Sequence, residues 1–129
     1  MLTLKKKGYR LSPETVDLLS QEFADSLTEA EADRKDILRL RLSLEEILES
    51  WSSALPGAPV TFCAKKRLGR QRIEIRVEGK ELQADDVLEN CLLSSRLLAQ
   101  AGLTLTQSYQ NGENCLTVEP PRKRKLGQM

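Results

Sequence analysis

Histidine is absent from this chain, and only three cysteines occur among its 129 residues. Cys63, Cys91 and Cys115 lie far apart in the sequence, so neither a CxxC metal motif nor Cys/His ligation is available. A serine nucleophile activated by histidine is excluded as well, because no imidazole exists to act as its base. The sequence therefore predicts no metal site and no Ser-His hydrolase, and it favours thiols that are buried as small apolar groups.

Long apolar runs and a charge excess are also missing. No stretch of 18 apolar residues occurs, and the opening MLTLKKKGYR has no apolar signal core behind its charges, so we expect a cytoplasmic chain that is neither exported nor membrane-spanning. The 20 basic and 19 acidic residues leave a net charge of +1, which removes a global electrostatic argument for nucleic acid. Because aromatic residues make up only 4%, the core must consist mainly of Leu, Ile and Val.

The length fits one domain, which we assign to residues 1–119, with the basic stretch 120–129 as a disordered tail or linker. A short strand is expected at 2–4. Ser12 as N-cap and Pro13 at the first helical position predict a helix over 13–27. A second helical pattern over 37–51 has apolar residues on two faces, with Leu38 and Leu42 on the second, which predicts packing on both sides.

Strand patterns dominate the rest of the chain. Residues 60–63 and 73–77 predict a hairpin around the polar turn 65–70, and Asp85 or Asp86 caps a third predicted helix that ends near Gly102. Asn111-Gly112 predicts a second hairpin over 103–109 and 114–118. The fold class expected from this order is α+β, a two-layer α/β sandwich with helices on one face of a mostly antiparallel sheet.

The segment LRLRLSLEEILESW at 38–51 resembles the first nucleotide-binding helix of the GHKL superfamily of histidine-kinase-like ATPases, especially the anti-sigma-factor-like kinases. The resemblance implies that Glu46 is the catalytic base. Ser50, four residues later, stands where the family has the asparagine that holds Mg²⁺ on ATP. Both side chains would face one pocket, because four residues make about one helical turn.

A second family motif binds adenine through an Asp followed by glycines. Glu78 and Gly79 occupy the matching positions, and Lys80 and Glu81 replace the rest of the glycine pattern. The chain then passes directly to Asp85, so the resemblance implies a histidine-kinase-like fold that lacks the ATP lid. The implied cofactor is ATP or ADP with Mg²⁺, bound weakly or no longer bound.

The opening KKGYRLSPET, the NGEN hairpin and the basic run near the end are together similar to small cytoplasmic domains that precede the membrane portion of some bacterial dicarboxylate or amino-acid:cation symporters. This likeness implies a protein partner, a transporter or regulator. It also implies a position at the inner face of the membrane, where Lys and Arg are retained.

Three functions remain open at this level. The first is a degenerate nucleotide-binding-fold module that acts as a regulatory or interaction domain. The second is a minimal Mg²⁺-dependent ATPase or kinase, although Glu46 is also explained by surface i,i+4 ion pairs and Trp51 by a place in the core. The third is RNA binding through the basic residues of 65–72, which a solvated hairpin tip explains equally, because no aromatics are interleaved among them.

Overall fold

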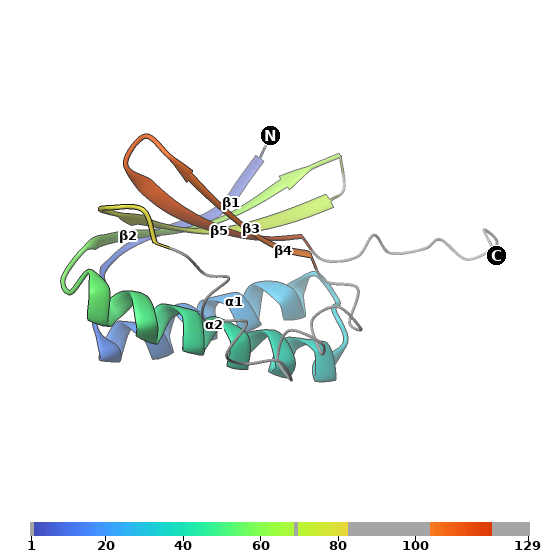
Figure 1. Ribbon diagram of the computed structural model, residues 1–129. Coiled ribbons are helices and arrows are strands. Elements are labelled where there is room, and N and C mark those ends of the chain that lie inside the picture. The colour runs from blue at the N-terminus through green and yellow to red at the C-terminus, as the bar shows by residue number, and fades with distance from the viewer. Residues whose placement is uncertain (1, 69, 83–103, 120–129) are drawn as a thin grey trace, which may run out of the picture.

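The computed structural model describes residues 2–68, 70–82 and 104–119 (Figure 1). Two helices and five strands form within these ranges, and all strand pairs are antiparallel, in the order β1-β2-β3-β5-β4. The elements are β1 (Leu2–Arg10), α1 (Pro13–Glu29), α2 (Arg34–Ala54), β2 (Pro59–Arg67), β3 (Arg70–Glu78), β4 (Thr104–Gln110) and β5 (Glu113–Glu119).

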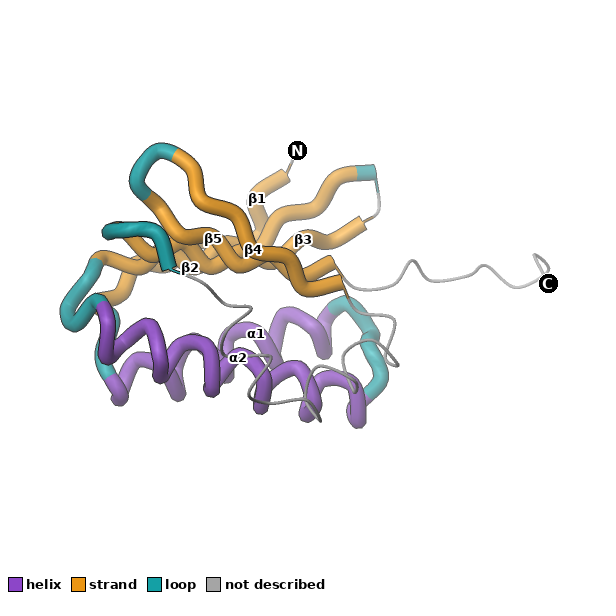
Figure 2. The backbone as a smooth tube through the Cα atoms, viewed as in Figure 1, coloured by secondary structure: helices purple, strands orange, loops and turns teal. Residues whose placement is uncertain are grey.

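The molecule has two layers. Figure 2 shows α1 and α2 side by side under one face of the sheet, and none of the described elements covers the opposite face. We call that opposite face the bare face. The α+β class and the two-layer sandwich expected from the sequence are therefore confirmed.

Local sequence explains where the helices begin. The Ser12 hydroxyl accepts a hydrogen bond from the Thr15 amide at 3.2 Å, and the Thr15 hydroxyl accepts one from the Ser12 amide at 2.8 Å, which forms a capping box ahead of Pro13. The Asp33 carboxylate caps α2 by accepting from the Lys35 amide at 2.8 Å. The predicted start of the first helix at Pro13 is confirmed.

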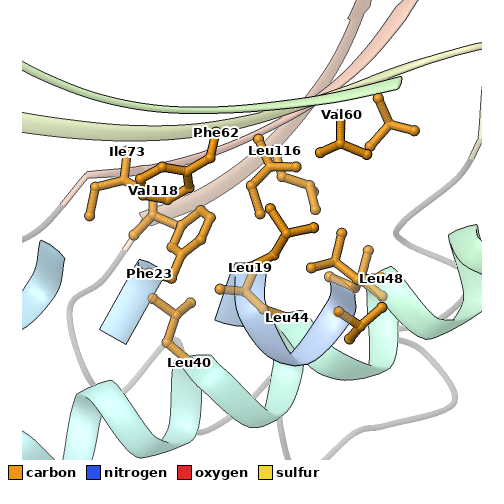
Figure 3. Packing of buried hydrophobic residues seen from close by; sticks show 14 of the residues in the cluster. Leu19, Phe23, Leu40, Leu44, Leu48, Val60, Phe62, Ile73, Leu116 and Val118 are labelled. Atoms are coloured by element: carbon orange, nitrogen blue, oxygen red, sulfur yellow. The ribbon is translucent and has the colours of Figure 1, made fainter. Parts of the chain in front are cut away.

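The core lies between the two layers. Leucines of the helices point toward the sheet, and branched residues of β2, β3 and β5 point back toward them (Figure 3). The rings of Phe23 and Phe62 meet edge to face, with centroids 5.5 Å apart. Trp51 is 1% exposed, so the predicted place of this residue in the core is confirmed.

Two predictions about the elements are wrong. Leu38 and Leu42 are 56% and 57% exposed, so none of the described elements packs on the second apolar face of α2. Strand pairing also runs further than the pattern indicated: β1 continues to Arg10, and β2 and β3 pair as far as Arg67 and Arg70. A polar sequence can extend a strand wherever one face is solvated and the neighbouring strand supplies the hydrogen bonds.

The second hairpin forms at Asn111 and Gly112, whose φ angles of 54° and 76° are those of a tight turn with two left-handed residues. This prediction is confirmed. The predicted helix after Asp85, Cys91, the position of an ATP lid and the tail 120–129 lie outside the described residues.

Candidate functional site

A shallow depression of about 510 Å³ opens at the end of β3, where the resemblance places adenine. We call it the Gly79 depression. Its lining comes from the start of β2, the end of β3 and the β4–β5 turn: Ala58, Pro59, Glu78, Gly79, Asn111, Gly112 and Glu113. The structure thus brings the two predicted adenine-binding residues, Glu78 and Gly79, to one surface.

The backbone of Gly79 is already engaged by the chain itself. Its amide donates to the Gly112 carbonyl at 3.0 Å, and its carbonyl accepts from the Tyr109 hydroxyl at 2.8 Å. The residue has a φ of +144°, and a Cβ here would lie 2.8 Å from Cδ1 of Leu55. Glycine is needed because a leucine side chain and a β-hairpin close on it from two directions.

Segment 80–82 continues from this glycine along the helix-facing side of β4 and β5. The buried Asn114 carboxamide accepts from the Leu82 amide at 2.7 Å and donates to the Lys80 carbonyl at 2.8 Å. The Gln107 amide donates to the Leu82 carbonyl. The turn after β3 is therefore held by side chains of the second hairpin.

The other two predicted site residues lie elsewhere. Glu46 and Ser50 are on α2, one turn apart, and neither lines the Gly79 depression. Ser50 is exposed. Glu46 is half-buried, and its buried Oε2 has no hydrogen-bond partner among the described residues. The i,i+4 ion pair of this helix joins Arg41 Nε to Glu45 Oε1 at 3.1 Å and does not involve Glu46.

A charged cluster on the bare face was missed by the sequence reasoning. Glu74 is only 4% exposed, although no described element covers it. Its Oε1 lies 3.2 Å from Nε of Arg72, and its Oε2 lies 3.0 Å from Nη2 of Arg76 and 3.4 Å from Nζ of Lys65. The alternation of 72–77 places these side chains on one face, but only the register with β2 brings Lys65 to the same carboxylate.

Charge interactions shift the titration of Arg76. Burial alone would lower the pKa of its guanidinium, but the Glu74 carboxylate outweighs burial and raises that pKa above its ordinary value. Arg76 therefore stays charged throughout the pH range in which the protein can be studied.

A groove follows β5 on the bare face, beside this cluster. It encloses about 150 Å³, and we call it the β5 groove. Its lining residues are Arg72, Glu74, Arg76, Ser108, Gln110, Asn111, Glu113, Cys115 and Thr117. The Cys115 thiol lies 3.5 Å from the Thr117 hydroxyl on the groove floor. Cys115 is half-buried here, whereas Cys63 is buried as expected.

Within the described ranges, no three Cys, Asp or Glu side chains gather so that they could hold a metal ion. Neither of the two described helices contains a stretch long and apolar enough to cross a bilayer. No family model matches the chain, and no curated protein matches it.

Proposed function

We propose that this chain is a non-catalytic regulatory or interaction module with a degenerate histidine-kinase-like ATPase fold, in which ATP binding is weak or lost. The observation that carries the proposal is the closed turn at Gly79. An adenine ring can approach a glycine backbone only where that backbone is accessible. At Gly79 the amide and the carbonyl are hydrogen-bonded within the chain, and an added Cβ would meet another side chain.

The bare face offers a surface for a protein partner. The strand register places mostly polar and charged residues on it, and none of the described elements covers it (Figure 1). The likeness of the opening segment to cytoplasmic domains of bacterial symporters supports a transporter as that partner. It also supports a position at the inner face of the membrane.

Calorimetric titration with ATP and ADP, with and without Mg²⁺, tests the loss of nucleotide binding. We expect no saturable heat at millimolar nucleotide, because Glu78 is exposed and Gly79 has no free backbone group. Micromolar binding that disappears in Glu78→Ala and persists in Glu81→Ala would contradict the proposal. Glu81 is the matched control, because it is an exposed carboxylate that does not line the depression.

A minimal Mg²⁺-dependent ATP-binding protein or kinase is the second candidate, and one observation favours it. The buried Oε2 of Glu46 has no hydrogen-bond partner in the described part of the chain, as expected of a general base that could accept a proton from a water or a substrate hydroxyl. Phosphate release from ATP that is lost in Glu46→Gln but retained in Glu49→Gln would support this candidate. Equal background release from the wild type and both variants would exclude it.

A further inference from the structure

The walls of the β5 groove come from three neighbouring strands. Strand register pairs Arg76 with Cys115 and Cys115 with Ser108, and it pairs Glu74 with Thr117. Long side chains of β3 therefore form one wall, while small side chains of β5 form the floor. The groove exists because β5 places a thiol and a hydroxyl where β3 places guanidinium groups.

Glu74 holds the two arginines that flank it on β3. Each guanidinium touches the carboxylate through one nitrogen, Nε for Arg72 and Nη2 for Arg76. The two side chains remain 46% and 42% exposed. A guanidinium has five N–H donors in a rigid fork, so both arginines keep donors for a further acceptor.

The charge of the cluster favours an anion. Three cations, Lys65, Arg72 and Arg76, surround the single carboxylate of Glu74, which therefore cancels only one of their charges. Basic residues are also in excess over the first three strands as a whole, which have ten basic and two acidic residues. The lining of the groove itself has two arginines and two carboxylates, Glu74 and Glu113, so the excess positive charge at the site comes from Lys65 beside it.

The size and the remaining lining narrow the class of anion. A space of about 150 Å³ equals that of about five waters, which suits a small tetrahedral group rather than a nucleotide. Ser108, Gln110 and Asn111 on the far wall add hydroxyl and amide donors. A phosphoryl group has three or four acceptor oxygens and matches the fork of arginine, so it can use both walls at once.

We propose that the β5 groove binds a phosphoryl group, held between the arginines of β3 and the polar side chains of β4. The site shares Asn111 and Glu113 with the Gly79 depression, but Arg72 and Arg76, on which it depends, do not line that depression. It does not depend on the proposed function. Glu74 acts as a positioning residue that orients Arg72 and Arg76, and Glu113 weakens binding from the rim.

Nuclear magnetic resonance titration of the full chain with inorganic phosphate tests the site. We expect saturable shifts of the amides of Ser108, Cys115 and Thr117. Binding should weaken about tenfold or more in Arg72→Ala and in Arg76→Ala, because each removes charge-assisted hydrogen bonds. It should strengthen about two- to fivefold in Glu113→Gln, which removes a repulsive charge. Lys66→Ala, an exposed cation outside the groove, should bind like the wild type.

Titrations with two further probes, a phosphoserine peptide and acetate, identify the class of ligand. Binding of a phosphoserine peptide tighter than that of inorganic phosphate assigns the group to a phosphoprotein, and equal or weaker binding assigns it to a small molecule. Acetate that binds as tightly as phosphate would overturn the phosphoryl assignment. No shifts with any of the three probes would overturn the site.

Alkylation of Cys115 gives a second readout that needs no variant. Iodoacetate and iodoacetamide have nearly the same size but differ in charge. If Arg72 and Arg76 attract anions into the groove, the rate at Cys115 should be higher with iodoacetate than with iodoacetamide. Peptide mass spectrometry follows both reactions. Phosphate should slow the alkylation of Cys115 and leave the alkylation rate of Cys63 unchanged. Absence of phosphate protection at Cys115 would contradict the proposal even if the arginine variants failed to fold.

Discussion

The carboxamide of Asn114 accepts a hydrogen bond from the backbone amide of Leu82 at 2.7 Å, across 32 positions of sequence. The same carboxamide donates to the Lys80 carbonyl at 2.8 Å and is fully buried. One side chain thus satisfies two backbone groups of a segment that leaves the sheet. The Gly79 turn keeps its shape because β5 holds the residues that follow it.

Replacement of Asn114 by alanine should destabilise the protein by about 2–4 kcal/mol, because it leaves two backbone groups without their partner. Urea denaturation followed by tryptophan fluorescence measures the change. Gln110→Ala, an exposed change on the same hairpin, is the control and should stay within about 0.5 kcal/mol of the wild type. An Asn114→Ala variant as stable as this control would show that the segment is not anchored by the carboxamide.

Gly79→Ala should cost more than Gly112→Ala, although both glycines have positive φ. At Gly112 nothing lies within 4 Å of an added Cβ, so only the backbone conformation is strained, which costs about 1–2 kcal/mol. At Gly79 the added Cβ also meets the Leu55 side chain at 2.8 Å. A double variant with Leu55→Ala should therefore show coupling between the two sites, and strict additivity of the two free-energy changes would exclude the clash.

Glu22 predicts a pH dependence of stability. Burial alone would raise the pKa of this carboxyl, but hydrogen bonds and charge from Lys5 and Lys7 lower it below its ordinary value of 4.5. A depressed folded-state pKa stabilises the protein above the unfolded pKa, and this contribution is lost as the pH falls through the folded value. Glu22→Gln should thus cost about 0.5–1 kcal/mol at neutral pH and progressively less below pH 4.5.

Thermal denaturation of wild type and Glu22→Gln from neutral pH to below pH 4 measures this difference. The exposed Glu49→Gln is the matched control for loss of a carboxylate. High salt should shrink the neutral-pH difference, because the Lys5 and Lys7 side chains are 35% and 48% exposed. A difference that stays constant across the pH range would rule out the ion pairs as its source.

The two leucine faces of α2 should respond differently to truncation. Leu44 is fully buried, so Leu44→Ala should cost about 2–5 kcal/mol. Leu42 is 57% exposed, and Leu42→Ala should change stability by no more than about 0.5 kcal/mol, since alanine also suits a helix. Chemical denaturation of both variants checks this. A large loss in Leu42→Ala would restore the two-sided packing that the sequence pattern suggested.

The elements were predictable where local chemistry decides. Ser12 and Pro13 start α1, and Asn111 and Gly112 form their turn, because caps and left-handed positions depend on a few adjacent residues. Strand ends at Arg10 and Arg67 were not predictable, because hydrogen bonds from a neighbouring strand sustain these polar stretches. Leu38 was misassigned for a related reason: periodicity shows a face but not whether anything packs on it.

The candidate sites were likewise predictable only where they depend on residues that are adjacent in the sequence. Glu78 and Gly79 could be placed at a strand end from the sequence, but the contacts that close on Gly79 come from Leu55, Tyr109 and Gly112, which no local pattern connects. The β5 groove could not be predicted from the sequence, because it depends on side chains from β3, β4 and β5 that are brought together only by the strand register.

Hydrophobic periodicity, caps and turn residues were enough to establish the α+β class and the core, because burial of Leu, Ile and Val dominates the folding free energy. The same signals were not enough to predict where the charged side chains lie. The sequence shows 20 basic and 19 acidic residues, but residues 11–58, which include both helices, have eleven acidic and four basic ones, and β1 to β3 have the reverse bias. Net charge is a sum over the chain, whereas the field at Glu74 or Arg76 depends on which side chains the sheet brings within a few ångströms.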